Sequence, residues 1–185
     1  MLLAPRRPSA SMIGNRPGDE GSMRVIPFAP EFETEVVQLI VSIQRDEFEI
    51  DISADDQPDL RGIASYYQTG RGNFWVAVLE GRVVGTISLL DIGAKQAALR
   101  KMFVAHASRG PALGVAKRLL VGWGVEQEIR EIFLGTTPFF HAAHRFYEKH
   151  GFSEIPRSRL PASFPIMEVD KKFYHLVVPK YIAGN

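Results

Sequence analysis

Residues 104–120 read VAHASRGPALGVAKRLL, and this stretch decides the fold. An apolar strand ends at Val104, glycines follow at Gly110 and Gly114, and a helix is predicted over residues 113–129. A glycine-containing turn before a helix directs backbone amides toward one point, where the helix dipole adds about half a positive charge. Although such a glycine pair can also be a simple turn, the segment favours a site for an anion, most often a phosphate.

Two familiar phosphate-binding motifs do not fit this segment. A nucleoside triphosphate loop needs Gly, four residues, Gly, Lys and then Ser or Thr, whereas Gly110 and Gly114 have neither that spacing nor the Lys-Ser/Thr pair. A dinucleotide-binding unit needs an acidic residue at the tip of the next strand, and that strand ends in Gly135, Thr136 and Thr137. An antiparallel hairpin also precedes the segment, which disfavours a parallel dinucleotide-binding fold.

Strand patterns dominate the chain before residue 104. The predicted strands cover residues 24–28, 73–79, 83–90 and 97–104. The middle pair flanks Glu80 and Gly81, which is the spacing of a two-residue hairpin, so the last three strands should form an antiparallel meander. A helix that begins at Pro30 and an acidic segment, residues 46–59 with seven acids and no base, follow the first strand.

The chain after residue 129 predicts a strand over 132–135, a helix, and a last strand over 173–178. Thr137 and Pro138 have the features of a helix start, with a hydroxyl to cap the first amides and a proline for the first turn. The helix should end at Gly151. Its predicted buried residues are Phe139, Ala142, Ala143, Phe146 and Tyr147.

Composition excludes several classes of protein. The 22 Lys and Arg against 21 Asp and Glu leave a net charge of +1, so no global charge favours a nucleic-acid partner. The absence of cysteine excludes disulfides, a cysteine nucleophile and thiolate metal sites, and is compatible with the cytoplasm. The longest apolar run, residues 74–79, is far shorter than the ~20 residues that span a bilayer. Residues 1–22 predict a disordered leader before a single domain over 23–185, with Met23 as an alternative start.

Four motifs in a fixed order extend the phosphate prediction to the whole chain. They are GRVVG at 81–85, LRKMFV at 99–104, RG followed by GVA within 109–116, and AHRFYEKHGF at 143–152. In this order they resemble the GNAT superfamily of N-acetyltransferases. QPDL at 57–60, LGTT at 134–137 and FPIMEVD at 164–170 resemble an uncharacterised bacterial subgroup. The resemblance implies an α/β fold, in which a mixed, mostly antiparallel sheet splays in its middle between helices on both faces.

The resemblance also implies how acetyl-CoA would bind. In the family, the strand that here ends in Met102, Phe103 and Val104 pairs its backbone with the pantetheine arm, and an amide at its splayed end polarises the thioester carbonyl. The loop that follows wraps the pyrophosphate with backbone amides. The residues that match this loop are Arg109, Gly110, Ala112, Gly114, Val115 and Ala116. The loop has two extra residues, and Pro111 cannot donate an amide, so its path should differ from that of the family.

Tyr147 is the candidate general acid. In the family a tyrosine in this Phe-Tyr-Glu-Lys context protonates the departing thiolate, and a phenol with a pKa near 10 is neutral at pH 7. The competing interpretation is that Tyr147 packs with Ala143 and Phe146 on the buried face of its helix. Phe140 stands where many members carry an Asn that contacts the coenzyme, so the resemblance does not extend to that contact.

The base that takes a proton from the attacking amine has no single strong candidate, because the strand before the glycine segment lacks the Glu of many family members. Asp91, at the end of the preceding strand, and Glu47, in the acidic segment, are the candidates on the acceptor side. The acidic segment either attracts a cationic amine or is a solvated loop whose Ser53, Asp55 and Asp59 cap helices.

These observations predict an enzyme that transfers the acetyl group of acetyl-CoA directly to a primary amine of a small molecule or a peptide. No metal, nucleic acid or membrane is expected to take part. A cytoplasmic location and a symmetric homodimer are default expectations. Two alternatives stay open, namely a regulatory module that binds acyl-CoA without turnover and a transferase for longer acyl groups.

Overall fold

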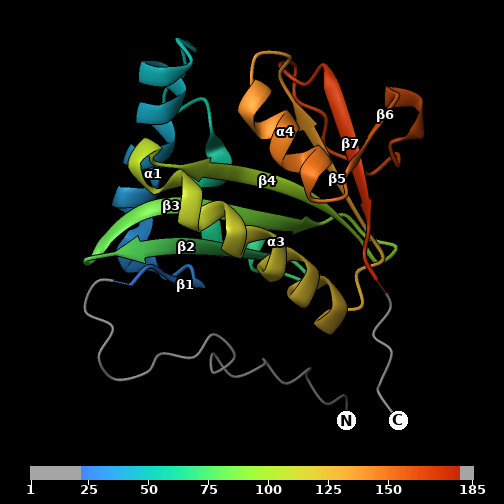
Figure 1. Ribbon diagram of the computed structural model, residues 1–185, viewed down its shortest axis with the longest axis horizontal. Helices are drawn as coiled ribbons and strands as arrows, with labels where there is room; N and C mark the ends of the chain where they lie inside the picture. The colour runs from blue at the N-terminus through green and yellow to red at the C-terminus, as the bar shows by residue number, and fades with distance from the viewer. Residues whose placement is uncertain (1–21, 180–185) are drawn as a thin grey trace.

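The computed structural model describes residues 22–179, and the side chains of residues 110–114 lie outside this description. The predicted leader therefore lies, except for Ser22, outside the described residues. All strands of the described chain join one sheet, in the order β1-β2-β3-β4-β5-β7-β6 (Figure 1). The strands are β1 (Arg24–Pro27), β2 (Asn73–Leu79), β3 (Arg82–Asp91), β4 (Gln96–Val104), β5 (Glu131–Thr136), β6 (Ser153–Ile155) and β7 (Lys172–Val177).

Strand pairing confirms the predicted hairpin and meander. β1, β2, β3 and β4 pair antiparallel in chain order, and so do β5 with β7 and β7 with β6. Glu80 and Gly81 both have positive φ, 50° and 76°, as the tight turns that match strand twist require. Among the strands of residues 22–179, only β4 and β5 run parallel, because the chain between them crosses over the sheet as a helix.

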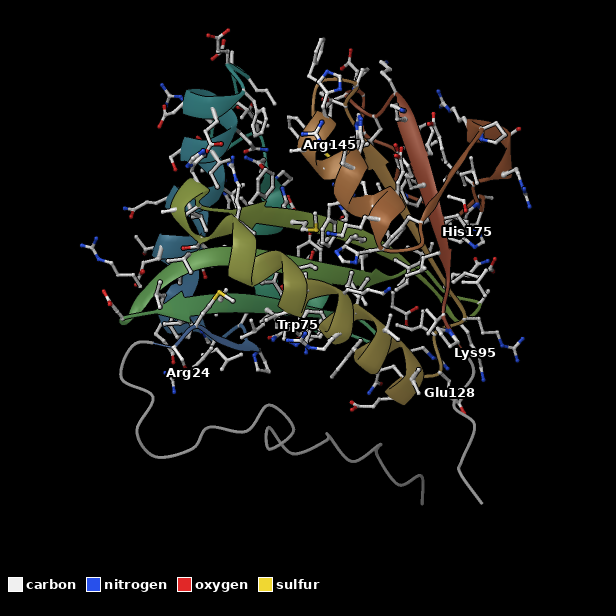
Figure 2. All side chains as sticks on the ribbon, in the orientation of Figure 1. Arg24, Trp75, Lys95, Glu128, Arg145 and His175 are labelled. Carbon is white, nitrogen blue, oxygen red and sulfur yellow. The ribbon has the colours of Figure 1, made fainter. Side chains whose placement is uncertain are left out.

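Helices cover both faces of the sheet. The helix α1 (Glu33–Ser42) and the short α2 (Ile63–Tyr67) lie on one face, and α3 (Arg109–Glu126) and α4 (His141–Lys149) lie on the other (Figure 1). Alternate residues of β2 divide the core, since Phe74 packs with α1 and α2 whereas Trp75 packs with α3. Figure 2 shows Trp75 beneath α3. The rings of Trp75 and Trp123 pack edge to face there, with their centroids 5.2 Å apart.

Single helical turns fill several of the connections. They are η2 (Pro30–Phe32), the π-helical η3 (Ile43–Glu47), η4 (Pro58–Leu60), η5 (His106–Ser108) and η6 (Arg157–Arg159). The first of these starts at Pro30 as predicted, and α1 follows it directly. The acidic segment thus contains the last residues of η3 and the first of η4, with irregular chain between them.

Two helix starts differ from the sequence prediction. α3 begins at Arg109, so residues 110–114 form its first turns instead of a loop; Pro111 is tolerated there because amides of the first turn have no partner within the helix. α4 begins at His141, and the Thr137 hydroxyl accepts a hydrogen bond from the Phe139 amide at 3.1 Å, which caps a turn and not the helix. Phe139 consequently projects from the surface, 78% exposed, and Ala142 is exposed as well. The prediction that both are buried is wrong.

Candidate active site

The central strands β4 and β5 pair over three residues and then separate. Gln96, Ala97 and Ala98 lie opposite residues 131–133, and within residues 22–179 no further pairing joins the two strands. Beyond this point β5 and β7 rise away from β2, β3 and β4, with α4 in front of them (Figure 1). The β5 side of residues 99–104 is therefore a sheet edge, whose amides and carbonyls can pair with an extended ligand.

A β-bulge in β4 lies at this free edge. The register against β3 shifts between Thr86 and Ser88, where β4 has one extra residue. Lys101 there has a φ of +50°, in the left-handed region that a lysine rarely adopts. The hydroxyls of Thr86 and Ser88 donate to the carbonyls of Lys101 and Arg100 at 2.7 and 2.8 Å. These hydrogen bonds hold the carbonyls of the bulge, and so they fix the direction of the neighbouring amides.

The side chain of Lys101 is buried beneath the acidic segment. Its Nζ donates to Oε1 of Gln57 at 2.7 Å and lies 3.2 Å from Oδ2 of Asp59, which also accepts from the Tyr67 hydroxyl at 2.5 Å. Burial lowers the pKa of Lys101, and the charge of Asp59 opposes this effect. Asp59 is thus a buried partner of the bulge, and its expected role as a helix cap on a solvated loop is wrong.

Other acids of this segment pair with their neighbours. Asp55 forms an ion pair with Arg61, and Asp56 accepts the amide and the hydroxyl of Ser53 at 2.9 and 2.6 Å. The hydrogen bonds from Ser53 lower the pKa of Asp56. These contacts fit the interpretation of a solvated loop better than that of a mouth for cationic amines.

Glu47 and Arg109 form an ion pair that joins the start of the acidic segment to the start of α3. The Nε of Arg109 also donates to the carbonyl of Val104 at 3.1 Å, which ties the same guanidinium to the end of β4. Glu47 therefore lies at the helix start that was predicted to hold the pyrophosphate, and its carboxylate is already engaged by a cation.

Several of the predicted coenzyme residues have side chains that pack in the core. Met102, Val115 and Ala116 pack against the core beneath α3, and Phe103 packs against the opposite core, with α1 and α2. An apolar pocket beneath α3 also includes Val104 and Ala116 in its lining. Because these side chains are packed, any contact of the same residues with a ligand would have to use their backbone.

Tyr147 of α4 is buried in an aromatic cluster. The residue is 7% exposed, with the rings of Phe152 and Tyr174 at 5.7 and 5.5 Å between centroids. Among the described residues its hydroxyl has no hydrogen-bond partner, so no contact there holds the phenol proton away from a ligand. Burial, followed by the charges of Tyr174 and Asp170, raises the pKa of Tyr147, which keeps the phenol protonated at neutral pH. Both interpretations of this residue are therefore compatible with its place.

Asp91 lies at the closed end of the sheet, away from the splay. Its residue partner in β4 is Ala97, at the level where β4 and β5 are still paired. Its two carboxylate oxygens accept the amides of Arg71 and Gly93 at 2.8 and 2.9 Å. These bonds hold two turns, and they argue against a part for Asp91 in proton transfer.

Within residues 22–179, no three His, Asp or Glu side chains gather as a metal site requires. The helices of the same part of the chain are all too short or too polar to cross a membrane.

Comparison with known proteins agrees with this geometry. Residues 37–152 match the sequence model of the acetyltransferase (GNAT) family. The chain belongs to this family. N-acetylaspartate synthetase of Xenopus tropicalis is 37% identical over 102 residues, which are 52% of this chain and 37% of that protein. N-acetyltransferase family 8 member 2 of Rattus norvegicus is 31% identical over 106 residues, 53% and 46% of the two chains. The matched part thus spans less than half the length of these relatives.

Solved structures of acetyltransferases confirm the fold. A GNAT acetyltransferase of Staphylococcus aureus superposes with a TM-score of 0.81 at 37% identity, over 85% of this chain and 100% of the other. An acetyltransferase of Streptococcus agalactiae superposes with a TM-score of 0.77 at 30% identity, over 84% of this chain and 98% of the other. The spermidine N-acetyltransferase of Vibrio cholerae, in complex with CoA and spermine, shares the fold at 18% identity, with a TM-score of 0.61 over 84% and 95%.

Two charged residues near the splay, Arg100 and Asp170, were not singled out as site residues in the sequence. The LRKMFV strand did carry a signal, because two successive charges break the alternation of a half-buried strand and indicate a bulge. Asp170 carries no local signal, since only the pairing of β7 with β5 brings its segment back to the splay.

Proposed function

We propose that this GNAT protein transfers the acetyl group of acetyl-CoA to a primary amine. The free edge of β4 beside the bulge carries the proposal, because backbone donors and acceptors over Met102, Phe103 and Val104 suit the amides of a pantetheine arm. The first turns of α3, with Arg109 and Gly110, would hold the pyrophosphate through helix amides and the dipole. The coenzyme in the V. cholerae neighbour supports the same cosubstrate.

The proposed chemistry is direct attack. The bulge would aim an amide at the thioester carbonyl, where it stabilises the charge that develops on oxygen. The Tyr147 hydroxyl would protonate the departing sulfur. Holding the amine beside the thioester supplies the remaining advantage, since a bimolecular reaction then becomes effectively unimolecular.

Ligand protection and thiol release test this proposal separately. Acetyl-CoA at a hundred times its dissociation constant should stabilise the protein by about 2.7 kcal/mol, whereas NAD and ATP should not. Thiol release that depends on an added amine would support acetyl transfer. Protection by acetyl-CoA without thiol release for any amine would instead favour a regulatory binding module, and faster release from longer acyl-CoA would favour a different acyl group.

We also propose a cytoplasmic location, where acetyl-CoA would be supplied. A symmetric homodimer stays a prediction that the mass from light scattering would check.

A further inference from the structure

Two opposite charges lie on the two arms of the splay, on the same face of the sheet. Along β4, Ala98 faces the cluster around Phe164, and Leu99 faces α3, so Arg100 returns to the face of Ala98. On the β5 side, Asp170 lies over Gly135, where a Cβ built on the glycine would be 2.5 Å from its carboxyl carbon. This is also the face of α1 and α2, opposite α3 and α4.

The guanidinium of Arg100 is half-buried and has weak partners. It donates to the carbonyl of Pro165 at 3.4 Å and to the sulfur of Met167, a poor acceptor. No carboxylate of the described residues lies within ion-pair distance of it, whereas the neighbouring Lys101 has Asp59. A guanidinium has five donors in a planar fork that matches a carboxylate, so most of this group is available to a ligand.

Only one of the two carboxylate oxygens of Asp170 accepts a hydrogen bond from the described residues. Its Oδ2 accepts the Met167 amide at 3.0 Å, which closes the turn of residues 167–170. Within the described chain, its Oδ1 accepts no hydrogen bond and the group lies beyond ion-pair distance of every cation. Burial raises the pKa of Asp170, against the opposing charges of Arg100 and Lys171, and this makes the carboxylate a better base than an ordinary one.

One turn thus holds a cation and an anion near each other without letting them pair. Both side chains contact Met167, Arg100 through its sulfur and Asp170 through its amide. The charge of Asp170 is also one of the causes that raise the pKa of Tyr147 on α4, so the carboxylate lies close enough to the phenol to act on it electrostatically. A ligand that carries both charges would neutralise the pair.

We propose that Arg100 and Asp170 form the acceptor site, and that the acceptor is an amine that also carries a carboxylate, as a free amino acid does. This inference rests on the proposed acetyltransferase function. The acceptor's carboxylate binds Arg100, and its ammonium group binds Oδ1 of Asp170.

The transfer balances with Asp170 as the base. The ammonium gives one proton to the Asp170 carboxylate, and the nitrogen lone pair forms the N–C bond to the acetyl carbon. The C–S bond breaks with its electron pair on sulfur, which takes a proton from the Tyr147 hydroxyl. The acylated nitrogen then loses its one excess proton, which passes to the tyrosinate and restores Tyr147, while Asp170 releases its proton to water as the net proton of the reaction.

The test compares free amino acids with their carboxamides, which keep the amine and lose the carboxylate. The wild-type protein should prefer the acids in kcat/KM. Arg100→Gln should reduce that preference about 10- to 100-fold, mainly through KM, the usual effect of losing a hydrogen bond to a charged group. Asp170→Asn keeps an oxygen for the Met167 amide and should lower kcat about 100-fold or more. The matched controls are Arg159→Gln and Glu168→Gln, two exposed neighbours, which should leave both quantities unchanged.

Protection by acetyl-CoA, measured for every variant, reports whether each has folded. Equal kcat/KM for acids and amides in the wild type, or an unchanged preference in folded Arg100→Gln, overturns the acceptor site. Absence of transfer to any amine overturns the proposed function instead. Calorimetry with CoA and a free amino acid then decides the site, because Arg100→Gln should abolish binding, and equal binding of acid and amide would contradict it.

Discussion

Phe48 and Phe140 pack against each other with ring centroids 4.1 Å apart. Phe48 follows η3, next to the ion pair of Glu47 with Arg109, and Phe140 directly precedes α4. The contact therefore joins the segment after α1 to the segment after β5, the two parts of the chain that lie on either side of the splay. A coenzyme seated in the splay would have this aromatic pair beside it.

Breaking this pair should speed the release of acetyl-CoA. An aromatic pair is worth about 0.5–1.5 kcal/mol, so Phe48→Ala or Phe140→Ala should raise the dissociation rate about 2- to 12-fold. The double variant should resemble each single one, because both lose the same contact. Stopped-flow displacement of acetyl-CoA measures the rate. Phe139→Ala removes an equal ring that is 78% exposed, and it should have no effect. Equal rates in all variants would show that the pair does not restrain the coenzyme.

Removing the charge of Lys101 should destabilise the fold strongly. Its side chain is 5% exposed and that of Asp59 is 11% exposed, so Lys101→Met leaves a buried carboxylate without its cation. We expect a loss of about 3–5 kcal/mol in the free energy of unfolding, measured by urea denaturation. Lys95→Met is the matched control, since Lys95 and Glu128 pair on the surface beside the end of α3 (Figure 2), where such pairs are worth about 0–1 kcal/mol. Similar losses in the two variants would mean that the buried network adds little.

Strand patterns and turn chemistry predicted most of the fold. The apolar run of β2 and the Glu80–Gly81 turn are local signals, and both elements have the predicted form. Helix starts were harder, because Thr137 and Pro138 have the chemistry of a cap yet are used by a turn that precedes α4. Local propensity does not show which of two competing turns the tertiary packing selects.

The sequence predicted the candidate site only where the site consists of backbone groups. The free edge of β4 follows from the order of elements, which the family resemblance supplied. The partners of Lys101 and the position of Asp170 depend on contacts between residues that are more than 30 positions apart, such as Gln57 with Lys101. No spacing rule within one helix or strand reports such contacts, so Asp59 was expected on a solvated loop and is buried.

Tyr147→Phe should lower turnover and leave coenzyme affinity near that of the wild type. The change removes one hydroxyl and little volume, and general acid assistance is commonly worth about 10²–10⁴ in rate. Tyr174→Phe is the control from the same cluster, since its hydroxyl donates to Glu148 at 3.1 Å and its loss should affect stability and not turnover. Wild-type turnover in Tyr147→Phe, with chemistry rate-limiting, would mean that Tyr147 has only a packing role and is not the proton donor.

The pH profile gives a second check on Tyr147. Burial raises its pKa above the ordinary value near 10, and the acid must be protonated to donate. The protonated fraction is therefore complete throughout the neutral range and falls only above about pH 10. We expect kcat of the wild type to show no alkaline decrease below that pH, and a decrease centred near pH 8 or 9 would assign the proton donor to another group.

Gly135→Ala should impair the acceptor side selectively. The added Cβ would lie 2.5 Å from the carboxyl of Asp170, too close for any contact, so the carboxylate must move away from β5. We expect kcat for free amino acids to fall about as far as in Asp170→Asn, while the dissociation constant of acetyl-CoA stays within error, because the coenzyme's proposed contacts lie on β4 and α3. Gly122→Ala adds the same methyl group in α3, where nothing lies within 4 Å, and should stabilise the helix by up to about 1 kcal/mol. Full turnover in Gly135→Ala would mean that the position of Asp170 over β5 is not required for transfer.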